Sequence, residues 1–237
     1  MKILIVIPTY NEEKILKDNI LKLFDYCQKN LTDDWKIVIA DNKSSDKTPV
    51  IGKSLASQFS KINYLYVNRQ GKGVAIKTAW QKYEVDIYCF MDADLAADLS
   101  ALLPLIQGIK VGNDVIAGSR FHPQSQVKRS ILRLIFSHGY RLALRILLGL
   151  KLSDAPCGFK AINNKVKESV LNQVQDESWF FDSELVILAE KKRYKLKEIP
   201  VNWHDPRGKG DRSKVKVLAL SLAYLKEIIK LKKRLNS

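Results

Sequence analysis

Short apolar runs alternate, along the first hundred residues, with longer stretches in which apolar residues recur at helical spacing. The runs at 3–7, 36–40, 62–67 and 87–91 are rich in Ile, Val, Leu and Phe, which is typical of strands buried on both faces. Between them the spacing predicts helices, one of them over 72–83. Strands that alternate with helices predict an α/β fold with a mostly parallel, doubly wound sheet and helices on both faces.

Turn and cap signals follow the first two strands. Pro8 ends the first run, and proline suits the exit of a buried strand better than its interior. Asn11 is expected to cap the helix that follows, because acids and then apolar residues come directly after it. Pro49 is expected in the first turn of the next helix, where proline is tolerated.

Acidic residues stand where two of the predicted strands end. Asp41 follows the second run, and Asp92-Ala93-Asp94 follows the fourth. Open α/β sheets bind ligands at the carboxyl ends of their strands, so these side chains are candidates for a binding site. Two close carboxylates repel each other unless a counter-charge is present, and a divalent cation with oxygen ligands supplies one. A solvated acidic turn is the simpler interpretation of the Asp-x-Asp motif taken alone.

Four motifs occur in one register over these hundred residues. They are Pro-Thr-Tyr-Asn-Glu-Glu at 8–13, Asp41 with the polar loop 42–48, Gly-Lys-Gly at 71–73 and Asp-Ala-Asp at 92–94. Together they resemble the nucleotide-sugar domain of family 2 glycosyltransferases, which have the Rossmann-like GT-A fold. The segments at 117–120, 154–160 and 179–185 further resemble the branch that makes polyprenyl-phosphate sugars, most of all the dolichyl-phosphate beta-glucosyltransferases. The resemblance covers about residues 3–215.

The resemblance implies a donor site and a metal. The donor-binding residues would be Pro8, Tyr10, Glu12, Asp41, Lys72, Asp92, Ala93 and Asp94. Asp92 and Asp94 would hold Mg²⁺ or Mn²⁺, with Asp94 the direct ligand and Asp92 contacting the metal or the ribose. Mannose synthases of this group often carry a metal-holding Gln at the position of Ala96, so the third ligand is left open. Lys72 also fits an exposed helix start, and a carboxylate at Asp41 suits uracil and guanine equally.

The net charge of +15 is concentrated in two segments. Residues 115–153 contain seven Lys or Arg and no acid, and residues 212–237 contain eight against Glu227 alone. In 127–150 the basic residues are interleaved with large aliphatic ones, which predicts one helix, or a pair broken near Gly139, lying at a membrane surface. Docking on an integral-membrane partner is the main competing interpretation. A nucleic-acid partner is disfavoured, because no stacking aromatics or nucleic-acid motif accompany the charge.

A lipid phosphate would explain why no clear catalytic base is present. Such an acceptor is already ionised near neutral pH and needs positioning by cations rather than deprotonation. The candidates for binding its phosphate are Arg120, Arg133, Ser137, Arg207 and Lys214. Arg133 and Ser137 share one helix face at i and i+4. An ion pair of Arg120 with Asp114 or another core acid, and a surface position for Arg133, are the alternatives.

The expected activity is metal-dependent, inverting transfer of a hexose, from UDP-glucose in the first instance, to a dolichyl-type polyprenyl phosphate. Asp94, Arg120 and Asp182 are the candidate catalytic residues, although Asp182 also fits a role in ordering the acceptor loop or capping a helix. One alternative is a GDP-mannose-dependent synthase. A second is a soluble transferase to a hydroxyl acceptor with Asp182 as general base. A third is a non-catalytic, membrane-docked subunit that binds nucleotide.

We expect one catalytic domain over residues 1–211, with a nucleotide-sugar half at 1–98 and an acceptor half at 99–211, followed by a basic C-terminal helix at 212–237. The C-terminal helix also fits packing on the catalytic core with a solvated basic end. Three widely spaced cysteines give neither a disulfide framework nor zinc spacing, which favours a reducing compartment. No apolar run is long enough to span a bilayer. We therefore expect a cytoplasmic protein, peripheral on the cytosolic face of a membrane.

Overall fold

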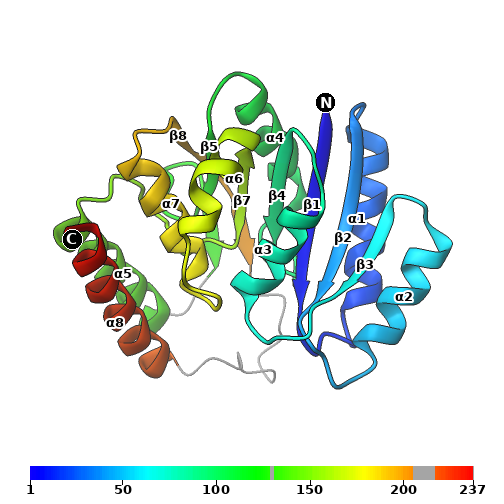
Figure 1. Ribbon diagram of the computed structural model, residues 1–237, viewed down its shortest axis with the longest axis horizontal. Coiled ribbons are helices and arrows are strands. Elements are labelled where there is room, and N and C mark those ends of the chain that lie inside the picture. Colours follow the sequence, from blue (N-terminus) through cyan, green and yellow to red (C-terminus); the bar gives the residue numbers. More distant parts are fainter. Residues whose placement is uncertain (129–130, 205–216, 237) are drawn as a thin grey trace.

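The computed structural model describes residues 1–128, 131–204 and 217–236 (Figure 1). Within them, seven strands form one sheet in the order β3-β2-β1-β4-β7-β5-β8, and β6 pairs with β9 separately. The strands are β1 (Lys2–Thr9), β2 (Asp34–Asp41), β3 (Ile62–Tyr66), β4 (Ile87–Met91), β5 (Val115–Ser119), β6 (Gln126–Lys128), β7 (Phe159–Asn163), β8 (Leu196–Pro200) and β9 (Asn202–His204).

Helices cover both faces of the central sheet. They are α1 (Leu16–Asn30), α2 (Thr48–Gln58), α3 (Lys72–Lys82), α4 (Leu102–Lys110), α5 (Ile131–Leu148), α6 (Asn164–Val170), α7 (Phe181–Lys191) and α8 (Val217–Asn236), with short 3₁₀ turns at Leu99–Ala101 and Leu171–Gln173. In β1, Leu4 and Val6 join the core under α3 and α5 to α8, whereas Ile3, Ile5 and Ile7 join the core under α1, α2 and α4. Alternate residues of a strand point to opposite faces, so the predicted doubly wound α/β fold is confirmed.

The sheet brings several chain segments to a single edge. β1 lies between β2 and β4 and is parallel to both, so the direction of winding reverses between β1 and β4. Ligands bind at such switch points, outside the carboxyl ends of the strands. β7 is antiparallel to its neighbours β4 and β5. Its first residue therefore lies at the same edge as the last residues of β4 and β5.

One local prediction is wrong, and two others are resolved by the structure. Asn11 does not cap a helix: α1 begins at Leu16, and Asn11 has a φ of 55°. Its side chain instead accepts a hydrogen bond of 2.8 Å from the backbone N–H of Ser45, which joins the loops after β1 and β2. Pro49 lies in the first turn of α2 as expected. Within the basic segment at 127–150, residues 131–148 form one continuous helix, α5, through Gly139, and residues 127–128 end β6.

The C-terminal helix α8 packs beside α5 at one end of the molecule (Figure 1). Ile228 and Leu231 of α8 are buried in the same core as Leu144 and Leu148 of α5. The basic residues of α8 are exposed at Lys226, Lys230, Lys232 and Lys233. Among the helices that the structure describes, none is both long and apolar enough to cross a membrane.

Candidate functional site

Asp41 is fully buried at the carboxyl end of β2 and is held by hydrogen bonds. Its Oδ1 accepts from the backbone N–H of Ser44 at 3.0 Å, and its Oδ2 accepts from the hydroxyl of Tyr64 at 2.5 Å. Burial, together with this hydrogen bond, raises the pKa of Tyr64 above its ordinary value, which keeps the hydroxyl a donor. The carboxylate is thus fixed in direction and retains lone pairs for a further donor.

The loops after β1, β2 and β3 are joined around this carboxylate. Pro8 pairs with Ala40 across β1 and β2, and the Tyr10 hydroxyl accepts from the Gln70 side chain at 3.0 Å. The backbone N–H of Glu12 donates to Thr48 Oγ1 at 2.8 Å. Tyr10 is 40% exposed. Pro8, Tyr10, Glu12 and Asp41, which the sequence predicts as one group, therefore share the edge formed by β1 and β2.

Lys72 begins α3 but is buried, which excludes an exposed helix start. Its Nζ lies 2.7 Å from Asp92 Oδ1 and 2.7 Å from Asp182 Oδ2. Burial by itself would lower the pKa of Lys72, but the two carboxylates outweigh it and raise the pKa, so the ammonium group stays charged. Lys72 thus ties the first turn of α3 to the end of β4 and to the start of α7.

Two glycines allow the first turn of α3 to pack closely against the segment that leads into α7. Gly71 has a φ of +144°, and a Cβ atom there would lie 2.1 Å from the carbonyl oxygen of Glu177. A Cβ atom at Gly73 would lie 2.7 Å from Cβ of Phe181. The backbone N–H of Gly73 instead donates to the carbonyl of Ser178 at 3.1 Å. Glycine is required here because α3 packs directly against the segment that leads into α7.

Asp182 is the buried partner of Lys72 in the first turn of α7. Burial raises the pKa of its carboxyl group, and the ammonium groups of Lys72 and Lys160 oppose that effect. Oδ2 bonds Lys72, whereas the buried Oδ1 has no hydrogen-bond partner within the described part of the chain. Asp182 therefore fixes Lys72 and the start of α7.

Asp92 and Asp94 follow β4 on a tight turn, in which Leu95 has a φ of 50°. The backbone N–H of Asp92 donates to the carbonyl of Gly158 at 3.2 Å, and a Cβ atom at Gly158 would lie 2.0 Å from Asp92 Oδ2. Asp94 Oδ1 accepts from the backbone N–H of Ala96 at 3.1 Å. The carbonyl of Ala93 accepts from the Asn19 side chain at 2.9 Å.

The two carboxylates of this turn fit a divalent cation that is shared with a substrate. The Asp92 side chain is 40% exposed although one of its oxygens contacts Lys72. Across residues 1–128, 131–204 and 217–236, no three His, Cys, Asp or Glu side chains form a cluster that could hold a metal ion. Mg²⁺-type ions are commonly bound by one or two carboxylates together with phosphate oxygens of the substrate. Asp92 and Asp94 match that donor set better than a closed protein cage.

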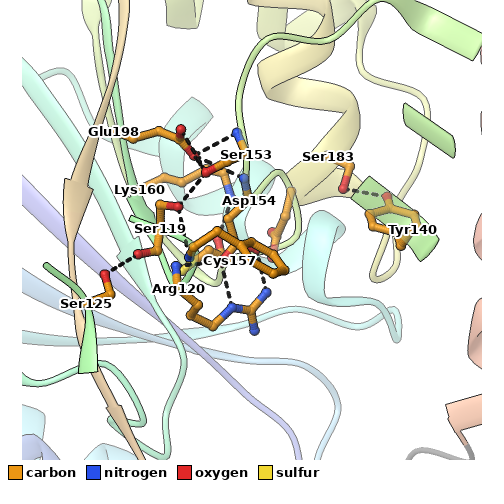
Figure 2. A network of polar contacts seen from close by, with 12 residues as sticks. Ser119, Arg120, Ser125, Tyr140, Ser153, Asp154, Cys157, Lys160, Ser183 and Glu198 are labelled. Carbon is orange, nitrogen blue, oxygen red and sulfur yellow. Dashed lines mark hydrogen bonds and ion pairs between the residues drawn. The ribbon is translucent and has the colours of Figure 1, made fainter. Parts of the chain in front are cut away.

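Arg120, just after β5, is paired with Asp154. Its backbone N–H, Nε and an Nη donate to the Asp154 carboxylate at 2.8, 2.7 and 2.6 Å (Figure 2). Burial alone would raise the pKa of Asp154, but the guanidinium outweighs it and lowers the pKa. The core acid that pairs with Arg120 is thus Asp154 rather than Asp114. Because a guanidinium has five N–H donors, the pair leaves Arg120 with N–H groups for a further anion.

A polar network holds the turn that carries Asp154. Glu198 of β8 accepts from the backbone N–H groups of Ser153 and Asp154 at 2.9 and 3.0 Å. The Ser153 hydroxyl lies 2.8 Å from one oxygen of Glu198 and 2.7 Å from the hydroxyl of Ser119, as Figure 2 shows. These bonds connect β5, β8 and the segment before β7. Glu198 was not predicted, because a single acid on a strand carries no local signal.

Lys160 is a second buried lysine that the sequence did not single out as a site residue. It lies on β7 opposite Phe90 of β4, and its Nζ donates to the carbonyl of Cys157. Burial lowers its pKa. Its position in the motif at 154–160 was the available signal. With Lys160 included, three cations (Lys72, Arg120 and Lys160) lie among three acids (Asp92, Asp154 and Asp182) at this edge.

The remaining acceptor candidates lie on or beyond α5. Arg133 and Ser137 are both residues of α5, but the position of the Arg133 side chain is not described. Arg207 and Lys214 lie outside the described residues. α5 reaches the Arg120 region through Phe121, whose ring stacks edge-on with His138 at 4.9 Å. Part of α5 therefore adjoins Arg120.

Comparison with known proteins identifies the relatives of the chain. A family model described as "Glycosyl transferase family 2" matches residues 4–171. Dolichyl-phosphate beta-glucosyltransferase of Saccharomyces cerevisiae is 28% identical over 245 residues, covering 95% of this chain and 72% of the yeast protein. Glycosyltransferase AglD of Haloferax volcanii is 29% identical over 211 residues, covering 88% of this chain but 34% of AglD. The chain therefore spans about a third of the length of that relative.

Solved structures share the fold at lower identity. Glucosyl-3-phosphoglycerate synthase of Mycobacterium tuberculosis, crystallised with Mn²⁺, UDP and phosphoglyceric acid, superposes with a TM-score of 0.70 and 17% identity, covering 96% of this chain and 76% of that chain. Mannosyl-3-phosphoglycerate synthase of Rubrobacter xylanophilus gives a TM-score of 0.67 and 12% identity, covering 100% and 75%. At these identities the likeness is one of fold alone.

The Arg120–Asp154 pair predicts a large and pH-dependent loss of stability in Asp154→Asn. Removing one partner of a buried pair leaves an uncompensated charge, so the free energy of unfolding should fall by about 3–5 kcal/mol in urea titrations near neutral pH. Because the pKa of Asp154 is lowered in the folded state, its stabilisation is present above the ordinary Asp pKa of about 3.9 and is lost as the pH falls through the folded-state pKa. The difference between wild type and variant should therefore shrink in acid.

Asp25→Asn is the matched control, since Asp25 is exposed on α1. It should change the stability by no more than about 0.5 kcal/mol. A stable Asp154→Asn variant, unfolding at the urea concentration of wild type, would show that the pair contributes little to the fold.

Proposed function

Because the chain belongs to glycosyl transferase family 2, we propose that it transfers a hexose from a nucleotide-sugar to a polyprenyl phosphate, with UDP-glucose as donor and a dolichyl-type phosphate as acceptor. The observation that carries the proposal is the gathering of Asp41, the Asp92–Asp94 turn and Arg120 at one sheet edge. Asp41 suits a nucleoside, the Asp92–Asp94 turn suits a diphosphate, and Arg120 suits a second phosphate. The relatives named dolichyl-phosphate beta-glucosyltransferase support the choice of donor sugar and acceptor.

The donor is bound by the edge of β1, β2 and β4. The fixed carboxylate of Asp41 accepts from a base N–H, and the 40% exposed ring of Tyr10 lies beside it, with Pro8 and Glu12 completing this end. Asp92 and Asp94 would hold Mg²⁺ or Mn²⁺. When bound, the metal ion neutralises the negative charge that develops on the departing diphosphate. Lys72 keeps Asp92 oriented and balances its charge.

The acceptor attacks with an oxygen that is already ionised. Its phosphate oxygen forms a bond to the anomeric carbon while the bond from that carbon to the diphosphate breaks, and the configuration at the anomeric carbon inverts. The N–H groups of Arg120 that do not bond Asp154 orient this phosphate, assisted by Arg133, Ser137, Arg207 and Lys214. Asp182 is buried and bonded to Lys72, which suits a positioning role and favours an ionised acceptor over a hydroxyl acceptor that needs a base.

A donor and acceptor screen tests this function. The protein is incubated with Mg²⁺ or Mn²⁺, a polyprenyl phosphate and UDP-glucose, UDP-galactose, UDP-GlcNAc or GDP-mannose, and the product is extracted into organic solvent. We expect transfer from UDP-glucose, dependent on the lipid phosphate. Transfer from GDP-mannose alone would identify a mannose synthase. Equal transfer to a polyprenol or a soluble sugar would show that the acceptor is a hydroxyl group rather than a lipid phosphate. No transfer from any donor would refute the proposal.

A second prediction concerns Asp94. Charge neutralisation by a metal is worth several kcal/mol in the transition state. Asp94→Ala should therefore reduce kcat/KM by at least about 100-fold, which is about 3 kcal/mol, and wild type should lose activity in excess EDTA. Asp18→Ala, on the exposed side of α1, is the control and should keep full activity. Normal turnover of Asp94→Ala, or of wild type in EDTA, contradicts the metal assignment.

We propose further that α5 and α8 dock on the cytosolic face of a membrane. Large apolar side chains are exposed at Ile135, Leu142 and Ile146 of α5 and at Leu225 and Ile229 of α8, with exposures of 41–71%. Exposed basic residues of the same helices accompany them. An apolar surface flanked by Lys and Arg suits the headgroup layer of anionic lipids, with the apolar side chains reaching the acyl boundary.

Charge reversal on this surface should release the protein from vesicles. Each basic residue near an anionic bilayer contributes about 1 kcal/mol, so Arg145→Glu with Lys226→Glu should weaken co-sedimentation with phosphatidylserine vesicles at least about 30-fold. Lys22→Glu with Lys29→Glu makes the same charge change on the exposed side of α1 and should have little effect. High salt should weaken wild-type binding without abolishing it, because apolar area is also buried. Equal loss in both double variants would indicate an effect of net charge alone.

A further inference from the structure

Trp179 is exposed although the chain around it is buried. Trp179 is 47% exposed, whereas the next two residues, Phe180 and Phe181, are 2% and 0% exposed. Of the other three tryptophans, Trp35 and Trp80 are buried and Trp203 is half-buried. At the start of α7 the chain thus directs the rings of Phe180 and Phe181 into the core and the indole of Trp179 to the surface.

The exposed indole borders the charged cluster of the site. Its ring centroid lies 5.7 Å from Lys72 Nζ, and that ammonium group is 2.7 Å from Asp92 Oδ1. Lys72 therefore contacts both the indole and the first carboxylate of the turn proposed to hold the metal ion and the diphosphate. Binding sites for small molecules commonly combine an aromatic surface with a few convergent charged groups.

The backbone that carries Trp179 is fixed on several sides. Its carbonyl accepts from the hydroxyl of Tyr224 of α8 at 3.2 Å. The preceding residue, Ser178, donates its N–H to Asp176 Oδ1 at 2.8 Å and accepts from the N–H of Gly73. The buried carboxylate of Glu184 accepts from the backbone N–H groups before this turn. A surface held in this way binds a ligand without the cost of ordering a loop.

We propose that the exposed face of Trp179 is the platform on which the hexose of the nucleotide-sugar stacks. A pyranose has an apolar face of C–H groups that suits an aromatic ring, and its hydroxyl groups suit the neighbouring ammonium and carboxylate groups. The hexose is attached directly to the diphosphate, so it must bind next to the Asp92–Asp94 turn, where the indole lies. This inference rests on the proposed function and adds the contact that distinguishes a nucleotide-sugar from its nucleotide.

Binding measurements test the platform without relying on turnover. Calorimetry with Mn²⁺ present should give a Kd for UDP-glucose about tenfold weaker in Trp179→Ala than in wild type, because the variant lacks the stacking surface; tenfold is about 1.4 kcal/mol. The Kd for UDP alone should be unchanged. Trp179→Phe keeps an aromatic face and should bind UDP-glucose better than Trp179→Leu, which keeps apolar bulk only.

Quenching of tryptophan fluorescence by iodide gives an independent readout, because Trp179 is the most accessible of the four tryptophans. UDP-glucose should protect the emission more than UDP does, and Trp179→Phe should remove that difference. Equal UDP-glucose affinity in wild type and Trp179→Ala would overturn the platform and leave the proposed function intact. Protection by lipid vesicles but not by UDP-glucose would make Trp179 a membrane anchor and overturn it as well. Failure of wild type to bind any nucleotide-sugar would overturn the platform together with the proposed function.

Discussion

The contact on which the rest of the site depends is the double ion pair of Lys72 with Asp92 and Asp182. It joins the start of α3, the end of β4 and the start of α7, three segments that are far apart in the sequence. A buried ammonium group is tolerated only with close counter-charges, and two neighbouring carboxylates only with a cation between them. Each member therefore requires the other two. Glycine at 71 and 73 lets the first turn of α3 pack closely against the segment that leads into α7. This packing holds the backbone that carries Trp179 in position.

The same requirement for balanced charge extends along the sheet edge. Arg120 is neutralised by Asp154, whose turn is held in place by Glu198, and the buried charges of Lys160 and Asp182 interact. Hydrogen bonds from fixed backbone groups hold several of these acids, so the charges are oriented before any ligand arrives. This preorganisation suits the meeting of two anionic substrates, because little reorganisation is then needed during the reaction. The hydroxyl of Tyr140 on α5 donates to Ser183 on α7, which connects α5 to the same region.

Local patterns predicted the sheet, and the family motifs named residues that the structure brings to one edge of it, although their role in binding a donor stays a prediction. Continuous apolar runs marked β1, β2 and β4, and the GT-A fold implied by the resemblance is the fold shared with the structural neighbours. Partners that lie far apart in the sequence were not identified individually. An ion pair of Arg120 with a core acid was an open alternative, but Asp154, 34 residues away, was not named as that acid. Nothing near Glu198 indicates its role. Lys160 is fully buried although lysine is normally exposed, and the direction of β7 depends on pairing that no local signal reports. Asn11 failed as a cap because its best partner lies on another loop.

The reversed direction of β7 has a consequence for how such chains can diversify. β5 ends, and β7 begins, at the same edge of the sheet, so the chain that includes α5 departs and returns at nearly one point. A chain segment anchored in this way can be lengthened, shortened or exchanged while the register of the strands stays the same. The entropic cost of closing a longer loop increases only slowly with its length. The surface beside Arg120 can therefore change with little disturbance of the Asp41 end.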